Sequence, residues 1–323
     1  MDVRQVIPKD AIPSVDDPRF GAGYDGDPED LVVVPTVGAI ARAYPVRYLN
    51  YHEIVNDDLP GGPPVAVTWC PLCGSAVVYD RRVAGRTLTF GVSGKLADDD
   101  LVMYDRETGS EWKQSLGEAI AGELAGSTLE VLPAATMPWR RFRERHPDGE
   151  VLQPPGGESE AASDGDDPAP IEYEDDPYRA YFEAEGFGLG AHRGGDGRDW
   201  PRDDLDPKTV VLGLEFDDEV LGVPLPLVVD AGGVVQVTVG EMEAVVFATD
   251  GGIHAFRDPG FDFESVGDDA GQDGGGFRAD GTTWDGTTGR AADGRELERL
   301  PAKRLFAFAW RDDHGDGAFL RAG

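Results

Sequence analysis

The sequence predicts a mainly β protein, a β-rich α+β fold, made of two diverged copies of one β-rich unit joined by an acidic linker. Strand-length apolar runs alternate with turn signals, helical periodicity is sparse, and short motifs recur in the same order in both halves. Four regions are expected: an extended N-terminal arm at 1–29, a first β-rich repeat with a CxxC motif at 30–153, an acidic Gly/Pro-rich linker with an aromatic segment at 154–207, and a second, degenerate β-rich repeat at 208–323.

The first repeat follows an arm that is rich in Pro, Asp and Gly and has no periodicity. Two short helices are expected, one around 46–53 and one at the Arg-rich stretch 138–146, where a proline in the first turn is tolerated. Ala84-Gly85 and residues 107–109 predict hairpin turns. Short apolar runs predict strands at 31–34, 40–46, 64–69, 75–83, 86–92, 100–105 and 128–133.

The linker and the second repeat differ sharply in composition. Gly, Pro, Asp and Ser predominate through 154–207, and within this stretch Asp175–Phe182 keeps three aromatic residues together. We expect that cluster to dock onto a domain. The strand pattern resumes after Lys208, with runs at 209–216, 219–229, 233–239 and 243–250.

Matched motifs support the internal repeat. They pair Ala76–Tyr79 with Ala244–Phe247, Trp112 with Trp284, Leu129–Ala134 with Leu297–Ala302, and Ala43–Val46 with Gly222–Leu225. Carried along the chain, this alignment places Thr238 opposite Cys70 and Glu241 opposite Cys73, with the region of His52 on Ala231. Any chemistry is therefore expected in the first copy, with the second as a scaffold.

Acidic residues dominate the charge. The chain carries 62 Asp+Glu against 29 Lys+Arg, a formal net charge of -33 and a pI near 4.3. This balance argues against nucleic acid and against an anionic membrane surface as partners. Only five of the basic residues are lysines, which with the acidic excess is typical of halophilic proteins, whose carboxylates are screened at molar salt. Each acidic run is accordingly interpreted first as solvated surface.

The expected location is the cytoplasm. The first residues lack the apolar core of a signal peptide, and no stretch approaches the length of a membrane helix.

The strongest local motif is Cys70-Pro71-Leu72-Cys73-Gly74. Two cysteines three positions apart do not make a disulfide framework, but a tight turn after a strand can point two sulfurs at a metal ion or hold a redox dithiol. The strand expected after Gly74 argues against a thioredoxin fold, which would place a helix there. With no second CxxC, three interpretations stay open for Cys70 and Cys73: a reactive dithiol, metal ligands, or inert core sulfurs.

Three further residues are weaker candidates. His52 is the nearest imidazole in sequence, and with Cys70 and Cys73 it could bind zinc or another transition metal ion with one position open; the alternative is a structural histidine. Asp105 and Arg106 belong to a polar stretch, 93–114, that could line a substrate pocket or form an ordinary surface hairpin. No other cofactor is indicated.

Several motifs in one order resemble a known family. They are LNYHEIVND, PVAVTWCPLCGSAVVYDRRVAGRTLTFGVSG, DLVMYDRETGSEWKQ and GEAIAGELAGSTLEVLPA, and they resemble the family called domain of unknown function 3179, strongly over 30–152 and more weakly to about Trp310. Some members are described as selenoproteins. The resemblance therefore implies redox chemistry at Cys70 or Cys73.

Two hypotheses of function follow. In the first, Cys70 or Cys73 is the nucleophile or metal ligand of a thiol redox or metal-assisted activity, His52 tunes or shares it, and the partner is an unidentified small molecule or protein thiol. In the second, the chain is a non-catalytic binding or structural module whose CxxC is a structural metal half-site or inert. Whether the chain is an enzyme stays open at this point.

Overall fold

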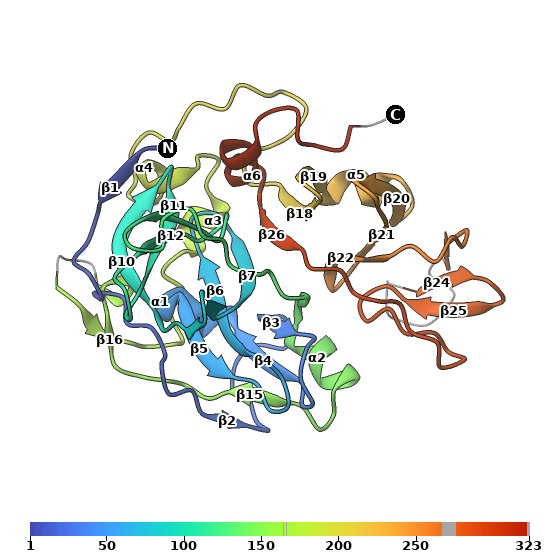
Figure 1. Ribbon diagram of the computed structural model, residues 1–323, viewed down its shortest axis with the longest axis horizontal. Helices are drawn as coiled ribbons and strands as arrows, with labels where there is room; N and C mark the ends of the chain where they lie inside the picture. Colours follow the sequence, from blue (N-terminus) through green and yellow to red (C-terminus); the bar gives the residue numbers. More distant parts are fainter. Residues whose placement is uncertain (164, 166, 267–275, 322–323) are drawn as a thin grey trace.

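The computed structural model describes residues 1–163, 165, 167–266 and 276–321 (Figure 1). The fold is mainly β and contains several sheets, as the sequence predicts. The strands pair antiparallel, except for β15 with β4. Three sheets have five or six strands, and their orders are β1-β10-β11-β12-β13, β14-β3-β4-β15-β2 and β19-β18-β26-β7-β6-β5.

The longer strands follow the apolar runs of the sequence, whereas β1 and β2 lie in the segment expected as an extended arm. The first sheet contains Val3–Gln5, Phe90–Ala97, Asp100–Asp105, Glu111–Lys113 and Glu118–Ala121. The second contains Ala134–Pro138, Leu31–Pro35, Arg42–Pro45, Glu150–Leu152 and Phe20–Gly21. The third contains Glu219–Pro224, Val210–Phe216, Lys303–Phe306, Ser75–Asp80, Pro64–Cys70 and Ile54–Asp58.

Smaller sheets complete the β structure. The two three-stranded sheets are β20 (Val234–Val239), β21 (Met242–Thr249) and β22 (Gly252–Arg257), and β23 (Glu264–Ser265), β24 (Gly276–Ala279) and β25 (Thr282–Asp285). The two-stranded pairs are β8 (Arg82–Val83) with β9 (Arg86–Thr87), and β16 (Glu158–Ser159) with β17 (Ala169–Pro170).

The helices are short, and all but α3 and α4 follow directly after a strand. They are α1 (Val46–His52), α2 (Trp139–Arg145), the 3-10 turn η1 (Glu160–Ala162), α3 (Arg179–Glu183), α4 (Gly188–His192), α5 (Leu225–Asp230) and α6 (Ala307–His314). The part of the chain that the structure describes contains no helix long and apolar enough to cross a membrane.

The six-stranded sheet joins the two halves of the chain. Strand β26 pairs with β18 on one side and with β7 on the other, where Arg304 lies opposite Ala76. In Figure 1, β26 runs between the strands of the first half and those of the second. The largest core follows this connection, because Cys70 and Cys73 are buried in one apolar cluster with Phe306, Phe308 and Trp310.

The two predicted helices are confirmed as α1 and α2, which begin directly after Pro45 and Pro138. The continuous strand predicted at 219–229 is wrong in its second part: β19 ends at Pro224 and α5 begins at Leu225. Pro226 lies in the first helical turn, where its missing N–H has no partner to lose. The predicted run at 128–133 makes only bridge contacts, Val131 with Tyr79 and Thr128 with Glu118.

Candidate functional site

The CPLC turn, residues 70–74, connects two central strands. Strand β6 ends at Cys70 and β7 begins at Ser75, directly opposite it. Gly74 has φ +54°, and a Cβ there would lie 2.7 Å from the ring of Phe306. Only glycine combines this left-handed backbone with so close an approach. The turn is thereby fixed against β26, the last strand in the sequence.

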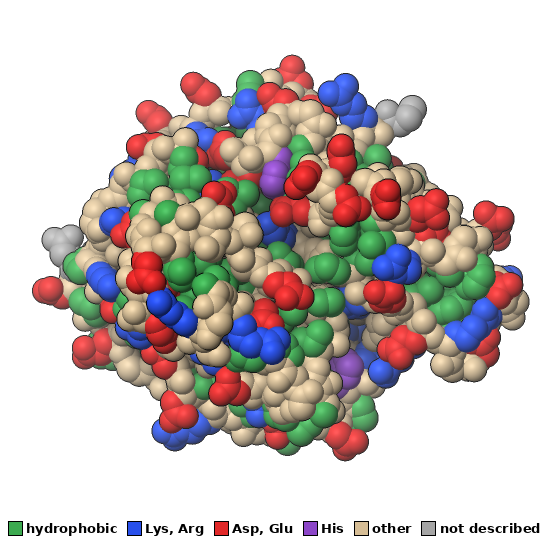
Figure 2. Space-filling view, viewed as in Figure 1, with side chains coloured by type: hydrophobic (Ala, Val, Ile, Leu, Met, Phe, Trp, Pro, Cys, Tyr) green, Lys and Arg blue, Asp and Glu red, His purple; other side chains and the backbone are tan. Residues whose placement is uncertain are grey.

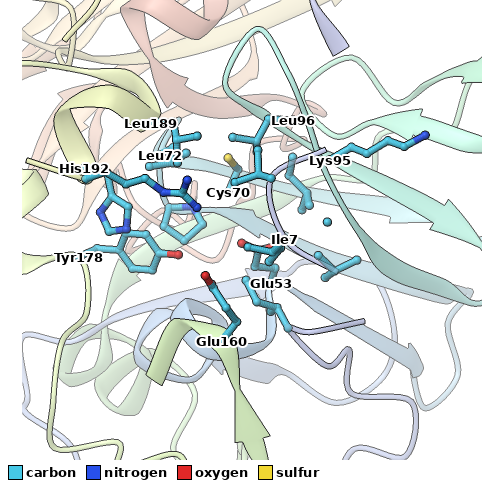
Figure 3. A pocket seen from close by; sticks show the side chains of 17 residues that line it. Ile7, Glu53, Cys70, Leu72, Lys95, Leu96, Glu160, Tyr178, Leu189 and His192 are labelled. Carbon is cyan, nitrogen blue, oxygen red and sulfur yellow. The ribbon is translucent and has the colours of Figure 1, made fainter. Parts of the chain in front are cut away.

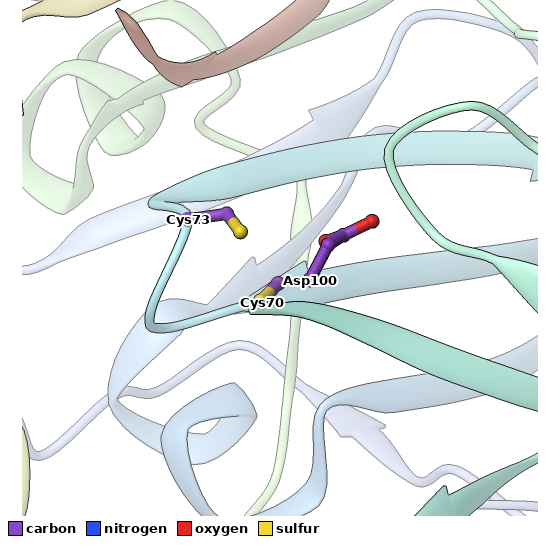
Figure 4. A group of neighbouring side chains, drawn as sticks. All are labelled: Cys70, Cys73 and Asp100. Carbon is purple, nitrogen blue, oxygen red and sulfur yellow. The ribbon is translucent and has the colours of Figure 1, made fainter. Parts of the chain in front are cut away.

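Three side chains that can act as metal ligands converge beside this turn: Cys70, Cys73 and Asp100 (Figure 4). One sulfur from each cysteine and a carboxylate oxygen of Asp100 all lie within 4.8 Å of one another, and all three residues are buried. The structure therefore brings together the two predicted cysteines, and it adds to them a carboxylate from the start of β11.

The Asp100 carboxylate has one unused acceptor. Its Oδ2 accepts the backbone N–H of Ser115 at 2.8 Å, whereas Oδ1 is buried and has no hydrogen-bond partner in the described residues. Burial raises the pKa of Asp100, and the charge of Lys113, whose ammonium pairs with Asp313 at 2.6 Å, only partly opposes this. A buried carboxylate oxygen without a partner is costly, and a bound cation is one way to satisfy it.

When no cation is bound, the surroundings of Cys70 and Cys73 oppose thiolate formation. Burial raises the pKa of Cys70, a hydrogen bond with Cys73 works against this, and the charge of Asp100 adds to the rise. Burial raises the pKa of Cys73 still further above its usual range, and its hydrogen bond with Cys70 adds to the effect. Both thiols are thus expected to be protonated at neutral pH when no cation is bound.

Cys70 lines a small cavity of about 90 Å³, whereas Cys73 does not. Figure 3 shows Cys70, Ile7 and Leu96 on one side, with Leu189, His192 and Tyr178 opposite. A larger hollow of about 760 Å³ shares several lining residues with this cavity, including Tyr178 and His192. Cys70 is therefore the sulfur that a molecule entering through this hollow would meet.

Glu53 lines the same cavity and is buried. Burial raises its pKa to about 8, with smaller contributions from the charges of Glu160 and Asp100. No hydrogen bond or ion pair to its carboxylate is found among the described residues. A buried carboxyl group with a pKa near neutrality can hold a proton and release it, which is the property of a general acid or base.

The 175–193 segment covers the turn. The hydroxyl of Tyr181 donates to the carbonyl oxygen of Leu72 at 2.7 Å and accepts the backbone N–H of Gly188 at 3.1 Å. Tyr178 packs on His192 with their rings stacked 4.8 Å apart. This segment therefore forms the outer wall of the Cys70 cavity.

His52 lies apart from the cysteine cluster. Its Nδ1 bonds the carbonyl oxygen of Pro13 at 2.8 Å, its Nε2 bonds the hydroxyl of Tyr173 at 2.7 Å, and burial lowers its pKa. It lines a different pocket, together with Ser14.

Asp105 forms hydrogen bonds within its own hairpin, whereas Arg106 also bonds the N-terminal arm. Asp105 accepts from the backbone and hydroxyl of Thr108 and from Nε1 of Trp112 at 3.0 Å. Arg106 donates to Asp16 and to Tyr104. Neither residue lines the Cys70 cavity.

Sequence reasoning missed Asp100 and Glu53. Asp100 ends the run Asp98-Asp99-Asp100, for which the acidic composition predicts solvated surface, although Asp100 also begins an apolar strand and so could face the core. Glu53 follows His52 directly, but α1 ends there and Glu53 takes a φ of +58°. The turn sends adjacent side chains to different pockets, which the sequence gives no signal to foresee.

Comparison with known proteins places the chain in a family. A search of curated proteins and a search of solved structures each return no match. The family model described as "Protein of unknown function (DUF3179)" matches residues 9–317, nearly the whole length. The order of motifs around the CPLC turn had pointed to the same family, and the chain belongs to the DUF3179 family.

Proposed function

We propose that Cys70, Cys73 and Asp100 bind a transition metal ion, and that the site carries out metal-assisted chemistry on a small molecule that enters through the Cys70 cavity. The observation that carries this proposal is the convergence of two sulfurs and a carboxylate oxygen within 4.8 Å, together with the unpartnered Oδ1 of the Asp100 carboxylate. Two thiolates and a carboxylate suit zinc among the common metals.

A cation would resolve the unfavourable electrostatics of the cluster. Without one, both thiols keep their protons because burial raises their pKa values. Metal coordination deprotonates thiols, so binding would release protons and satisfy the carboxylate at the same time. Three protein ligands leave a position open on zinc, where the metal acts as a Lewis acid.

Glu53 supplies a proton-transfer group to this site. It lines the cavity beside Cys70, and its pKa of about 8 leaves it protonated at pH 7. In the proposed reaction Glu53 would give a proton to the substrate or accept one from it.

Metal analysis of protein purified with and without chelator tests the assignment. One equivalent of zinc is expected in the wild type, and the Asp100→Asn variant is expected to bind zinc at least about tenfold more weakly, since it loses a charged ligand. Asp98→Asn is the matched control, because Asp98 is in the same hairpin and is not one of the converging donors. Stoichiometric zinc binding by Asp100→Asn with wild-type affinity would exclude Asp100 as a ligand.

A second candidate function is thiol redox exchange. The observation that favours it is the asymmetry of the pair: Cys70 lines the cavity, while Cys73 lies behind it and donates to the carbonyl oxygen of Asp99 at 3.5 Å. Cys70 would attack the disulfide of a small molecule or protein, releasing one thiol and forming a mixed disulfide with the other. Cys73 would then attack this mixed disulfide, releasing the second thiol and leaving a Cys70–Cys73 disulfide. If Cys70 and Cys73 are a redox pair, they should form a disulfide reversibly even in the Asp100→Asn variant. A site that only binds a metal does not require such a disulfide.

A non-catalytic module gives a third outcome in the same experiments. A structural metal would be lost only on unfolding, and inert thiols would bind no metal and resist oxidation. The three outcomes are therefore distinguished by metal content, by thiol titration and by the denaturation midpoint with chelator.

We also propose that the chain is a diverged duplication. Equivalent backbone hydrogen bonds in the two halves support this. The N–H of Leu129 donates to Gly117 as that of Leu297 does to Gly289, and the N–H of Leu132 donates to Val78 as that of Leu300 does to Ala255. In the third pair, the N–H of Asp80 donates to Glu130 as that of Arg257 does to Glu298. These pairs favour a match of β7 with β22, one strand later than the sequence comparison chose. The CPLC turn then corresponds to the β21–β22 turn, which contains no cysteine.

The remaining assignments rest on composition. The acidic stretch between the copies would serve as linker and outer wall, and the cytoplasm of a salt-accumulating cell is the compartment that suits a net charge of -33. An increase in the denaturation midpoint with salt, up to molar concentration, would support the second point.

A further inference from the structure

A second pocket, of about 330 Å³, lies between the two halves of the chain and shares no lining residue with the Cys70 cavity. One wall comes from the β3–β4 connection and β14, and the other from residues 287–299. Figure 2 shows a hollow between the two halves, with acidic, basic and histidine side chains at its edge.

The wall from the first half is apolar. It contains Val34, Val37, Ala39, Ile40, Ala135 and Met137. Ile40 is 40% exposed, and it is one of the few large hydrophobic side chains of the described residues that the fold leaves in contact with solvent. This wall favours an apolar ligand body.

The opposite wall presents a guanidinium group without an acidic partner. Arg299 donates to the carbonyl oxygen of Thr287, approaches Nδ1 of His254 at 3.4 Å, and lies over the ring of Phe256 at 4.5 Å. No ion pair of Arg299 is found in the described residues, and these contacts leave some of its N–H donors unused. Most arginines of this acidic chain are paired, as Arg295 is with Asp280 and Asp293.

The electrostatics of the pocket favour a negatively charged ligand. Burial lowers its pKa to about 10, and the charge of Asp285 only partly opposes this. Burial also lowers the pKa of His146 on the same pocket, and Arg290 and Arg145 lower it further. A cationic environment that disfavours additional positive charge would be stabilised by a negative one.

The excess positive charge is small. Arg290 is already paired with Glu296 at 3.1 Å on the rim, so Arg299 contributes the one unbalanced guanidinium of the lining. One planar guanidinium matches one planar carboxylate, whereas Glu296 would repel a dianion.

We propose that this pocket binds a small organic carboxylate, with its carboxylate on Arg299 and its apolar body against the wall that contains Ile40. The site is separate from the cysteine cluster, and its occupancy would tie the second half of the chain to the first.

Calorimetric and thermal-shift titration of the full chain with hexanoate tests the proposal, with hexanamide as the neutral probe of the same shape. Saturable binding of hexanoate and a rise in Tm are expected, with at least about tenfold weaker binding of hexanamide. Titrations in potassium fluoride and potassium chloride at equal ionic strength show whether chloride competes.

Two pocket variants and one control keep the test sharp. Arg299→Met is expected to lose the hexanoate response while the unliganded Tm stays the same or rises, because a partly buried charge without an acidic partner is removed. Ile40→Asp, at an exposed position, is expected to lose the response without unfolding, and Arg257→Met, which removes a surface guanidinium paired with Glu298, is expected to keep it.

Several results would overturn the proposal. These are no saturable hexanoate binding by the wild type, equal binding of hexanamide, an unchanged response in both Arg299→Met and Ile40→Asp, or saturation by chloride with no further effect of hexanoate.

Discussion

The backbone N–H of Phe306 donates to the carbonyl oxygen of Cys73 at 2.7 Å, so a strand from the second half of the chain closes the CPLC turn. The ring of Phe306 also lies against Gly74. The candidate site is thus formed by the first half but is completed by the second. Each of the following predictions tests one part of that arrangement.

Replacing Gly74 with alanine is expected to lower the free energy of unfolding by about 2–4 kcal/mol, since it adds backbone strain at φ +54° and a clash with the Phe306 ring. Gly109→Ala is the matched control: its φ is +72°, but a Cβ there meets no atom within 4 Å, so a loss of only about 1 kcal/mol is expected. Urea denaturation at fixed salt measures both. Equal losses would mean that contact with Phe306 does not constrain the turn.

Glu53 should make metal-free protein less stable as the pH rises. Its folded pKa of about 8 lies above its unfolded value, so the folded state binds more protons between the two, and stability falls by about 1.4 kcal/mol per pH unit across that window. The fall stops above the folded pKa. Glu53→Gln is expected to remove this slope, which denaturation at several pH values with chelator present would detect. Identical pH profiles for the variant and the wild type would contradict the raised pKa.

Alkylation of metal-free, folded protein should be slow at pH 7 and should reach Cys70 before Cys73. Both thiol pKa values are raised, and only Cys70 lines the cavity. Mass spectrometry after timed iodoacetamide treatment gives the order, and the rate is expected to rise with pH beyond the ordinary thiol range. Preferential labelling of Cys73 would exclude Cys70 as the reactive sulfur.

Tyr181→Phe is expected to cost about 1–2 kcal/mol of stability, because the hydroxyl bonds both Leu72 and Gly188. The same variant should increase the rate of Cys70 alkylation, since the covering segment is released from the turn. For comparison, Tyr178→Phe removes a hydroxyl for which no hydrogen bond is found in the described residues. A larger effect of Tyr178→Phe than of Tyr181→Phe would argue that these hydrogen bonds do not hold the segment.

The sequence predicted the β class and the local elements well where apolar pattern and turn chemistry agree. The helices after Pro45 and Pro138 are examples. It failed at Leu225–Asp230, where a strand-like apolar run follows a proline and forms a helix against the sheet instead. Apolar composition alone does not distinguish these two outcomes in a short buried segment.

The candidate site was predictable only in its local part. The two cysteines are close in sequence, so their proximity needed no tertiary information. Asp100 reaches them through the pairing of β10 with β11, and the acidic character of the chain concealed it among surface carboxylates. Neighbouring positions 52 and 53 face different pockets because of one backbone angle at a helix end.

The insertion of β26 beside β7 has a consequence for how the protein folds during synthesis. The Arg304 side chain donates to the carbonyl oxygen of Gly74, 230 residues earlier in the chain. Until β26 has been made, one side of β7 therefore remains an unpaired sheet edge next to two free thiols. A nascent chain would expose both an aggregation-prone edge and an oxidisable pair throughout most of its translation. Protection of the thiols should therefore appear late, together with the final strand, as a slow step in refolding.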